Sequence, residues 1–242
     1  MNLTKLANKF IFTPTCFVCA APLPFSYKMP YICDKCSIKS HLINIKICEC
    51  CKKPRDIDPL KPACPYCNGD KFPFDNYISP FYYEGAIQFS IRDYKFTRRF
   101  GNAKSFAHFM AIKLKYLDNF KPEVIIPAPS SKRRIISRGF NHTLLLAKHL
   151  SEMTDIPYDN VLVKIRHTKP QSLLTRKERE TNLKGAFDIK PHNYKNVLLI
   201  DDIYTTGSTV KELCKVLRKS GVKEISVATV AHTYYSENER LD

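Results

Sequence analysis

The chain has 242 residues, of which 44% are hydrophobic, so it can bury the core of a medium domain and a smaller one, which argues against global disorder. No apolar run approaches the ~20 residues that span a bilayer, so the sequence contains no transmembrane segment. Lys and Arg number 39 against 23 Asp and Glu, and the net charge of +16 favours polyanionic partners such as nucleic acid or phosphorylated metabolites, unless it serves solubility alone.

The first residues, MNLTKLANKFIF, contain lysines but lack the long apolar segment and small-residue cleavage site of a secretion signal. We therefore expect a cytoplasmic protein, with the inner face of the membrane as an alternative location. Nine of the ten cysteines lie between Cys16 and Cys67. Because disulfides are disfavoured in a reduced compartment, clustered cysteines indicate metal binding.

Eight of these cysteines form four C-x2-C pairs. The pairs are Cys16 with Cys19, Cys33 with Cys36, Cys48 with Cys51, and Cys64 with Cys67. Two such tight turns supply a tetrahedral four-thiolate zinc site, so four pairs predict two structural zinc ions. The separations of thirteen and twelve residues favour sequential pairing, as in a double zinc ribbon. Interleaved pairing and redox-active C-x-x-C are the alternatives.

We predict a double zinc-ribbon-like domain over residues 1–73, whose metal supplies most of its folding free energy because so short a segment buries little core. Cys50 is left beside Cys51 as a spare or alternative ligand. Cys214 lies at an apolar helical position in VKELCKVL and is predicted to be an inert core residue.

Strand-like and helical patterns alternate over residues 77–236. Strands are expected in NYISPFYY, EVIIPAP, NVLVKI, VLLI and EISVATVA, and helices in SIRDYKF, AKSFAHFMAIKLKYL, NHTLLLAKHLSEM and TVKELCKVLRKSG. The polar stretch RKERETNLKGAF is expected to lead into a short helix. This alternation predicts an α/β domain with a mainly parallel sheet, in which ligands bind at the carboxyl ends of the strands.

Residues 197–209, VLLIDDIYTTGST, place two aspartates after a buried strand and a hydroxyl-rich turn before a helix. The amino end of a helix suits a phosphate. The turn positions that would bind it are Thr205, Thr206, Gly207, Ser208 and Thr209. Because carboxylates repel phosphate, Asp201 and Asp202 suit the vicinal hydroxyls of a ribose instead. A simple helix cap is the alternative, and the chain has no Walker lysine motif and no G-x-G-x-x-G.

The same stretch resembles the phosphoribosyl-pyrophosphate (PRPP) signature of type I phosphoribosyltransferases. PAPSSKRRIISRGFNHT (residues 127–143) and QSLLTRKERETNLKGAF (residues 171–187) resemble segments of the ComF/ComFC family of competence proteins, and the cysteine pairs and YYEGAIQFSIRDYKF match too. Together these stretches cover nearly the whole chain. The resemblance implies a type I phosphoribosyltransferase-like α/β domain behind a small four-cysteine-type zinc-binding domain. His142 departs from the family, which usually has glutamine there.

This resemblance implies that the domain binds PRPP with Mg2+. Asp201 and Asp202 would hold the ribose 2′- and 3′-hydroxyls, and residues 205–209 the 5′-phosphate. The pyrophosphate side would be formed by Pro129, Ser130, Ser131, Lys132 and Arg133. The sequence displays no evident nucleobase hood and no general base, so the catalytic residues, the acceptor and enzymatic activity itself stay open.

Lysines and arginines gather in three clusters, and in the first of them they alternate with Tyr94, Phe96 and Phe100. Cations with interleaved aromatics suit single-stranded nucleic acid, whereas core aromatics beside a solvated charged face are the alternative. The nucleic-acid-binding residues predicted from the clusters are Arg92, Lys95, Arg98, Arg99, Arg134, Arg138, Arg176 and Arg179. The family resemblance favours single-stranded DNA.

Two functions therefore compete. The first is a competence protein that handles single-stranded DNA during natural transformation, alongside other cytoplasmic DNA-uptake proteins. The second is an active phosphoribosyltransferase of nucleotide salvage. A PRPP-sensing binding module lies between them.

Overall fold

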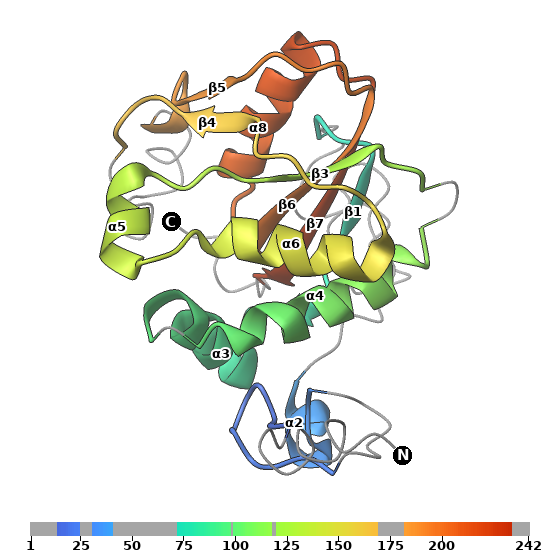
Figure 1. Ribbon diagram of the computed structural model, residues 1–242, viewed down its shortest axis with the longest axis vertical. Helices are drawn as coiled ribbons and strands as arrows, with labels where there is room; N and C mark the ends of the chain where they lie inside the picture. The colour runs from blue at the N-terminus through green and yellow to red at the C-terminus, as the bar shows by residue number, and fades with distance from the viewer. Residues whose placement is uncertain are drawn as a thin grey trace, which may run out of the picture.

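The structure, a computed structural model, describes residues 14–24, 31–40, 72–97, 99–117, 120–168 and 182–233. A parallel sheet with the strand order β1-β7-β6-β3 forms its centre (Figure 1). The strands are β1 (Asn76–Ile78), β3 (Val124–Pro127), β6 (Asn196–Tyr204) and β7 (Glu224–His232). Strand β2 (Phe81–Tyr82) follows β1 and also pairs with β7. The predicted α/β domain with a parallel sheet is confirmed.

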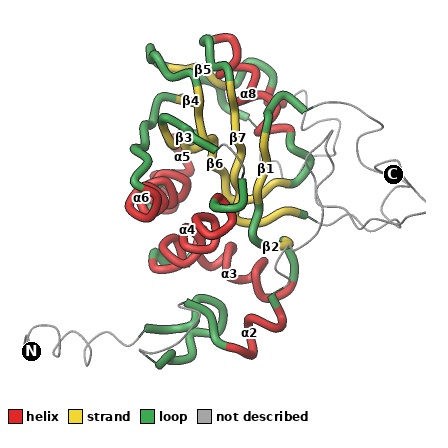
Figure 2. Tube along the Cα trace, turned by 90° about the vertical axis from the view of Figure 1, so that its right-hand side faces the viewer, coloured by secondary structure: helices red, strands yellow, loops and turns green. Residues whose placement is uncertain are grey.

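Helices cover both faces of this sheet because apolar side chains alternate along β6. Leu198 and Ile200 pack with α3 (Gly85–Phe96), α4 (Gly101–Leu114) and α6 (His142–Thr154). Val197 and Leu199 point to the other face and pack with α8 (Ser208–Lys219). Figure 2 shows α3, α4 and α6 together on one side of the strands. Every strand that builds the central sheet is therefore buried on both faces.

Two parts of the sheet domain differ from the expectations. Strand β6 does not end at Ile200: it stays paired with β7 as far as Tyr204, opposite His232, so both aspartates lie within the strand. The segment expected to lead into a short helix is helical at Asn182 and Leu183, as predicted, but it then enters a strand that was not expected, β5 (Phe187–Ile189), which pairs antiparallel with β4 (Leu162–Lys164). Pairing with a neighbouring strand decides both outcomes, and neither is visible in local hydrophobicity.

Two short helices complete the described elements. Helix α5 (Lys132–Arg138) follows β3, where the hydroxyl of Ser131 caps it by accepting from the Arg134 N–H at 3.4 Å. Helix α2 (Asp34–Lys39) lies in the cysteine-rich segment. Neither was expected from apolar spacing, because a helix of one or two turns offers too few positions for a periodic pattern. No described helix combines the length and hydropathy that a bilayer crossing requires.

The described cysteine-rich residues pack against the sheet domain below α3 and α4 (Figure 1). The ring of Phe17 is 4% exposed and meets the rings of Phe106 at 5.3 Å and Phe81 at 6.1 Å. Tyr31 contacts His108 of α4 at 5.1 Å between ring centroids. The two parts of the chain therefore share one hydrophobic core, and the cysteine-rich segment does not bury its apolar residues alone.

Candidate ligand-binding site and metal centre

A cavity of about 720 Å³ lies at the carboxyl ends of β3 and β6. Both aspartates and the loop before α8 line it, together with residues of α3, α5, α6 and the β4–β5 pair. Five basic side chains line it against the two carboxylates: Arg92, Lys95, Arg134, Arg138 and Lys164. Its size is that of a small-molecule site, and its surplus of cations suits a ligand with several negative charges.

Asp202 is buried at 9% exposure and is held by two side chains from different helices. Lys95 Nζ of α3 lies 2.8 Å from its Oδ2, and His142 Nε2 of α6 lies 2.6 Å from the same oxygen. Burial disfavours the charged carboxylate, but Lys95 and His142 outweigh burial and hold the pKa of Asp202 well below its usual range. Because both partners use Oδ2, Oδ1 is left by the described side chains to accept a hydroxyl of a ligand.

His142 is neutral in this network. The guanidinium of Arg138 can only donate, and its Nη1 lies 3.0 Å from His142 Nδ1, so Nδ1 carries no proton. The proton is therefore on Nε2 and is donated to Asp202. Burial, and repulsion from Lys95 and Arg138, lower the pKa of His142 in agreement with a neutral ring. A glutamine amide also has a donor group and an acceptor group. His142 can therefore form the two hydrogen bonds, to Asp202 and from Arg138, that a glutamine could form at this position.

Asp201 has a different environment. Its Oδ1 accepts the backbone N–H of Asp202 at 2.8 Å, and among the described residues it forms no ion pair. Burial, together with the charge of Asp202, raises the pKa of Asp201 to about 7. The two neighbouring carboxyls thus differ: Lys95 and His142 favour the charged form of Asp202, whereas burial and the charge of Asp202 disfavour ionisation of Asp201, which a ligand or metal ion can promote.

This difference predicts a pH dependence of stability. The Asp201 carboxyl ionises near pH 4 in the unfolded chain but near pH 7 in the native one, so the native state binds more protons between these values. The contribution of Asp201 to the free energy of unfolding therefore falls as pH rises from about 4 to about 7. We expect Asp201→Asn to gain stability relative to the natural protein across this range, measured by urea unfolding at several pH values. Parallel stability curves would contradict the assignment.

The loop between β6 and α8 has the form of an anion site. Gly207 caps α8 with φ +77°, and Lys211 N–H donates to its carbonyl at 2.8 Å. The hydroxyls of Thr206 and Ser208 share a hydrogen bond of 2.8 Å at the amino end of the helix. The cavity lining includes Thr205, Gly207, Ser208 and Thr209, which the sequence predicts, but not Thr206. A helix of 12 residues therefore presents its positive end and its hydroxyls to the cavity.

The predicted pyrophosphate side is divided by helix α5. Pro129, Ser130 and Ser131 line the cavity. Lys132 and Arg133 are exposed in the first turn of α5 and are not among the described residues that line it. Arg134 and Arg138, predicted for nucleic acid, line the cavity in their place. The sequence motif predicts which residue types the loop contains. Helix α5, which the sequence did not predict, decides which of the basic side chains line the cavity.

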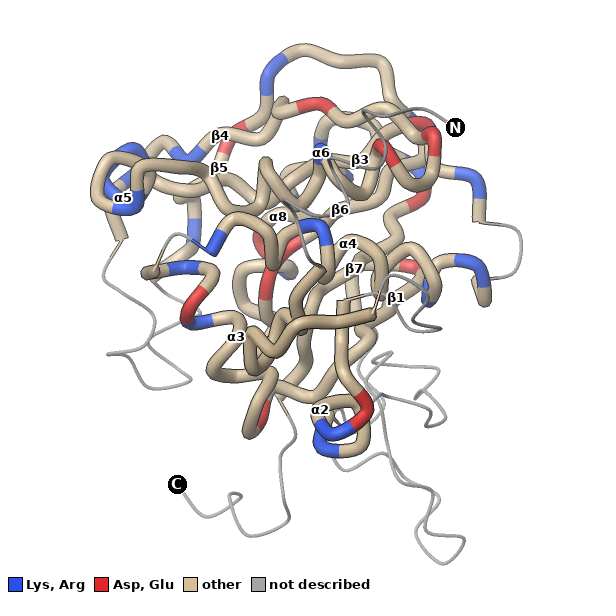
Figure 3. Tube along the Cα trace, turned by 60° about the horizontal axis from the view of Figure 1, so that its bottom comes forward, with Lys and Arg blue, Asp and Glu red and all other residues tan. Residues whose placement is uncertain are grey.

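The predicted nucleic-acid residues differ in their surroundings. Lys95 is committed to Asp202, while Arg92 and Arg99 are exposed. Figure 3 shows the basic residues of α5 gathered at one end of the molecule. Arg98, Arg176 and Arg179 lie outside the described residues. Of the aromatic residues, Tyr94 is a core residue at 1% exposure, whereas Phe96 is 69% exposed.

The sequence did not reveal how Lys95 and Lys164 contribute to the cavity. Lys164, on β4, donates to the hydroxyl of Thr168 at 2.6 Å. Burial, and repulsion from Arg134 and Arg166, lower its pKa to about 8. No spacing rule links these lysines to the aspartates, because they belong to different elements. In the sequence these lysines stand out only as members of Lys- and Arg-rich stretches.

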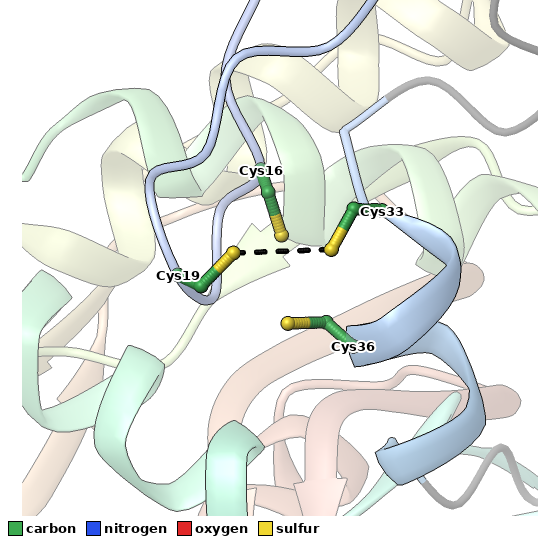
Figure 4. Close-up of side chains that lie close together, drawn as sticks. All are labelled: Cys16, Cys19, Cys33 and Cys36. Atoms are coloured by element: carbon green, nitrogen blue, oxygen red, sulfur yellow. Dashed lines mark hydrogen bonds between the residues drawn. The ribbon is translucent and has the colours of Figure 1, made fainter.

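Four cysteines form a candidate metal centre. The Sγ atoms of Cys16, Cys19, Cys33 and Cys36 lie within 4.8 Å of one another, and those of Cys19 and Cys33 are 3.8 Å apart (Figure 4). Thiolates at the corners of a tetrahedron ~2.3 Å from a zinc ion would be about 3.8 Å apart, so the four residues fit zinc. The first two pairs thus meet in sequence order. The second predicted set, Cys48, Cys51, Cys64 and Cys67, lies outside the described residues together with Cys50.

Comparison with known proteins agrees with this geometry. Residues 135–240 match the family model of the phosphoribosyl transferase domain. Competence protein F of Haemophilus influenzae is 31% identical over 81% of this chain and 94% of its own length. Competence protein ComFC of Bacillus subtilis is 28% identical over 82% of each chain, and the DNA utilization protein YhgH of Escherichia coli O157:H7 is 27% identical over 90% of this chain and 96% of its own.

Matches among solved structures include the purine phosphoribosyltransferase of Pyrococcus horikoshii. It is 23% identical, with a TM-score of 0.35 over 55% of this chain and 77% of that one. The domain matched by the family model contains β6, the loop of residues 205–209 and α8. The chain therefore has an α/β phosphoribosyltransferase-type fold, preceded by a cysteine-rich module compatible with zinc.

Proposed function

The chain belongs to the competence protein F family, and from this premise we propose that it handles single-stranded DNA during natural transformation, while its phosphoribosyltransferase-like domain binds PRPP with Mg2+. One observation carries the second part. Two carboxyl groups whose pKa values are shifted in opposite directions line one cavity, together with the amino end of a helix and a surplus of cations. A ligand with vicinal hydroxyls beside several phosphates matches this lining, because the hydroxyls can donate to the aspartates and the phosphates can meet the helix end and the cations.

The chain would bind such a ligand with distinct groups. Asp201 and Oδ1 of Asp202 accept the ribose hydroxyls, and the amino end of α8 with the hydroxyls of Ser208 and Thr209 receives the 5′-phosphate. Pro129, Ser130 and Ser131 lie on the pyrophosphate side, and Arg134 and Lys164 offset the remaining charge. Asp201 offers carboxylate oxygens that form no ion pair with any described side chain, and bound Mg2+ would supply further neutralisation of phosphate charge.

The DNA-handling part rests on the family and on charge. The net charge of +16 and the exposed Arg92, Arg99 and Arg134 support a polyanionic partner. We expect the protein to act in the cytoplasm or at the inner face of the membrane, together with other DNA-uptake proteins. We also propose a second structural zinc site formed by Cys48, Cys51, Cys64 and Cys67, because their spacing repeats that of the described set.

Catalysis of phosphoribosyl transfer is the second candidate function. The retained Asp201 and Asp202 favour it, because a domain with a purely structural role does not require two neighbouring carboxyl groups in a cavity. The cations of the lining would stabilise negative charge on a departing pyrophosphate. Pyrophosphate release from PRPP with Mg2+, screened against bases, nucleosides and single-stranded DNA, separates this enzyme from a protein that only binds.

Gly207 provides a sharp test of PRPP binding. A Cβ placed on Gly207 would overlap the phenol oxygen of Tyr204, whose ring is 1% exposed and packed 5.0 Å from that of Tyr77. The buried Tyr204 ring cannot move away from the added Cβ, so Gly207→Ala should distort the loop before α8. We expect calorimetry with PRPP and Mg2+ to show at least tenfold weaker binding, or ~1.4 kcal/mol.

Gly221→Ala is the matched control. Gly221 also has positive φ, +94°, but its added Cβ would meet only Lys195 Nζ at 3.5 Å, at the opposite end of α8. The backbone cost of a side chain is therefore shared by the two variants, whereas the overlap occurs only at residue 207. Equal PRPP affinity in the two folded variants, or no PRPP binding by the natural protein, would reject the proposed site.

A further inference from the structure

Helix α3 has a buried face and an exposed aromatic face. Ile87, Ile91 and Tyr94 are at most 1% exposed and pack in the core. Phe89 and Phe96 are 66% and 69% exposed. At ~100° per residue, Phe89, Arg92 and Phe96 lie within about 60° of one another on the side opposite the core. Two large rings that flank an arginine in solvent are not explained by the packing of this helix.

The exposed face continues beyond the helix end. Arg99 is exposed and lies 3.4 Å from Asp93, and Phe100 is 45% exposed with its ring edge-on to Phe140 at 4.8 Å. We call Phe89, Arg92, Phe96 and Arg99 the α3 ridge. Along it, rings and guanidinium groups alternate at intervals of three and four residues. On α3 this alternation places two planar stacking surfaces and the cation of Arg92 on one side of the helix, and the ion pair with Asp93 holds Arg99 next to the same helix.

The ridge ends at the cavity. Arg92 and Phe96 belong to the α3 ridge and also line the cavity. The guanidinium carbon of Arg138 lies 5.2 Å from the centre of the Phe96 ring. The same Arg138 donates to His142, which donates to Asp202. A nucleic-acid base stacked on Phe96 would therefore lie close to Arg138. That guanidinium is linked to Asp202 through the hydrogen bonds of His142.

We propose that single-stranded nucleic acid binds along the α3 ridge, with bases stacked on Phe89 and Phe96 and phosphates paired with Arg92 and Arg99, and that it reaches the cavity mouth at Phe96. This inference rests on the proposed function and specifies the surface that performs it. The ridge contains aromatic rings and cations, as single-strand binding requires. A second copy of this chain is a poorer occupant because two chains of charge +16 repel each other.

The ridge differs from the residues predicted by sequence. Phe89 joins it, although no pattern singled it out. Tyr94 is excluded because it is buried and its hydroxyl donates to the His142 carbonyl at 2.5 Å. Lys95 is excluded because Asp202 holds it. The structure thus divides one basic and aromatic stretch into a core part, a cavity part and an exposed part.

The test measures the anisotropy of a labelled oligothymidylate at several salt concentrations. Phe89→Ala combined with Phe96→Ala removes two stacking partners, and we expect at least tenfold weaker binding with an unchanged dependence on salt. Arg92→Ala combined with Arg99→Ala should instead flatten the log–log salt slope by about 1.4, since each phosphate contact contributes ~0.7 on a single strand. Weaker binding with an unchanged salt slope therefore indicates lost stacking, whereas a flatter salt slope indicates lost phosphate pairing.

Two controls accompany these variants. Phe89→Tyr with Phe96→Tyr keeps both rings and should bind as the natural protein does. Tyr116→Ala removes a ring that is 77% exposed beyond the far end of α4, and it should also bind normally. Wild-type affinity in the double alanine variant, with oligonucleotide binding otherwise intact, would overturn the ridge and leave the proposed function standing. No oligonucleotide binding by the natural protein at low salt would reject both, whatever calorimetry gives for PRPP.

Discussion

Replacing Asp202 with alanine is expected to destabilise the protein by about 3–5 kcal/mol and to abolish PRPP binding. The side chains of Lys95 and His142 are only 16% and 8% exposed and both meet the same carboxylate oxygen. Removal of that carboxylate leaves a buried ammonium and a buried imidazole N–H without their partner. Breaking a buried ion pair on one side costs far more than the pair contributes, because the remaining charge stays desolvated.

Asp201→Ala provides the comparison for stability. Asp201 has no cationic partner among the described residues, and its pKa is raised to about 7, so its removal strands no charge. We expect a much smaller change in urea unfolding midpoint for Asp201→Ala than for Asp202→Ala, although both variants should lose affinity for PRPP. Similar destabilisation of the two variants would mean that Asp202 is not the carboxylate that organises the site.

A compensating variant tests the reason for the loss. In Asp202→Asn the amide oxygen still accepts from His142, but Lys95 remains unpaired. Adding Lys95→Met removes the stranded ammonium and keeps its apolar stem, so the double variant should be more stable than Asp202→Asn alone. The coupling energy from the double-mutant cycle measures the pair directly. An additive double variant would show that Lys95 and Asp202 do not interact in solution.

Loss of one described cysteine is expected to have a still larger effect on the small module. A structural zinc site stabilises its folded segment by roughly 10–16 kcal/mol, and three thiolates do not replace four. Cys33→Ser should therefore lower the zinc content of reduced protein, measured by elemental analysis, by about one ion per chain. With the second proposed site intact, the natural protein should hold about two ions and the variant about one.

The module and the sheet domain should respond together to zinc loss. Phe17 follows Cys16 directly and packs against Phe81 and Phe106 of the main core. Unfolding of the cysteine-rich segment would withdraw this ring, so Cys33→Ser should also lower the thermal midpoint of the whole protein. Cys214→Ala is the control, because Cys214 is buried in α8 away from the cluster. Zinc-free natural protein, purified reduced and without chelator, would contradict the metal centre.

Much of the architecture follows from the sequence because its causes are local. The spacing of Cys16, Cys19, Cys33 and Cys36 determines how thiolates meet, and alternating apolar patterns predict strands and helices. The motif of residues 197–209 keeps its groups together because strand, loop and helix are consecutive. The family resemblance adds the ligand class to these local patterns.

The tertiary structure alone decides how those groups are tuned. Asp202 meets Lys95 and His142, from two other helices, across 107 and 60 positions of sequence, and no periodicity connects such distances. Tyr94 and Phe96 are aromatic residues only two positions apart, yet one is buried and the other exposed, because α3 turns only one face to the core. Strand β6 continues through the aspartates because β7 pairs with it. Residue types follow from sequence, whereas charge state and exposure depend on which elements pack together, since both are set by neighbours distant in the chain.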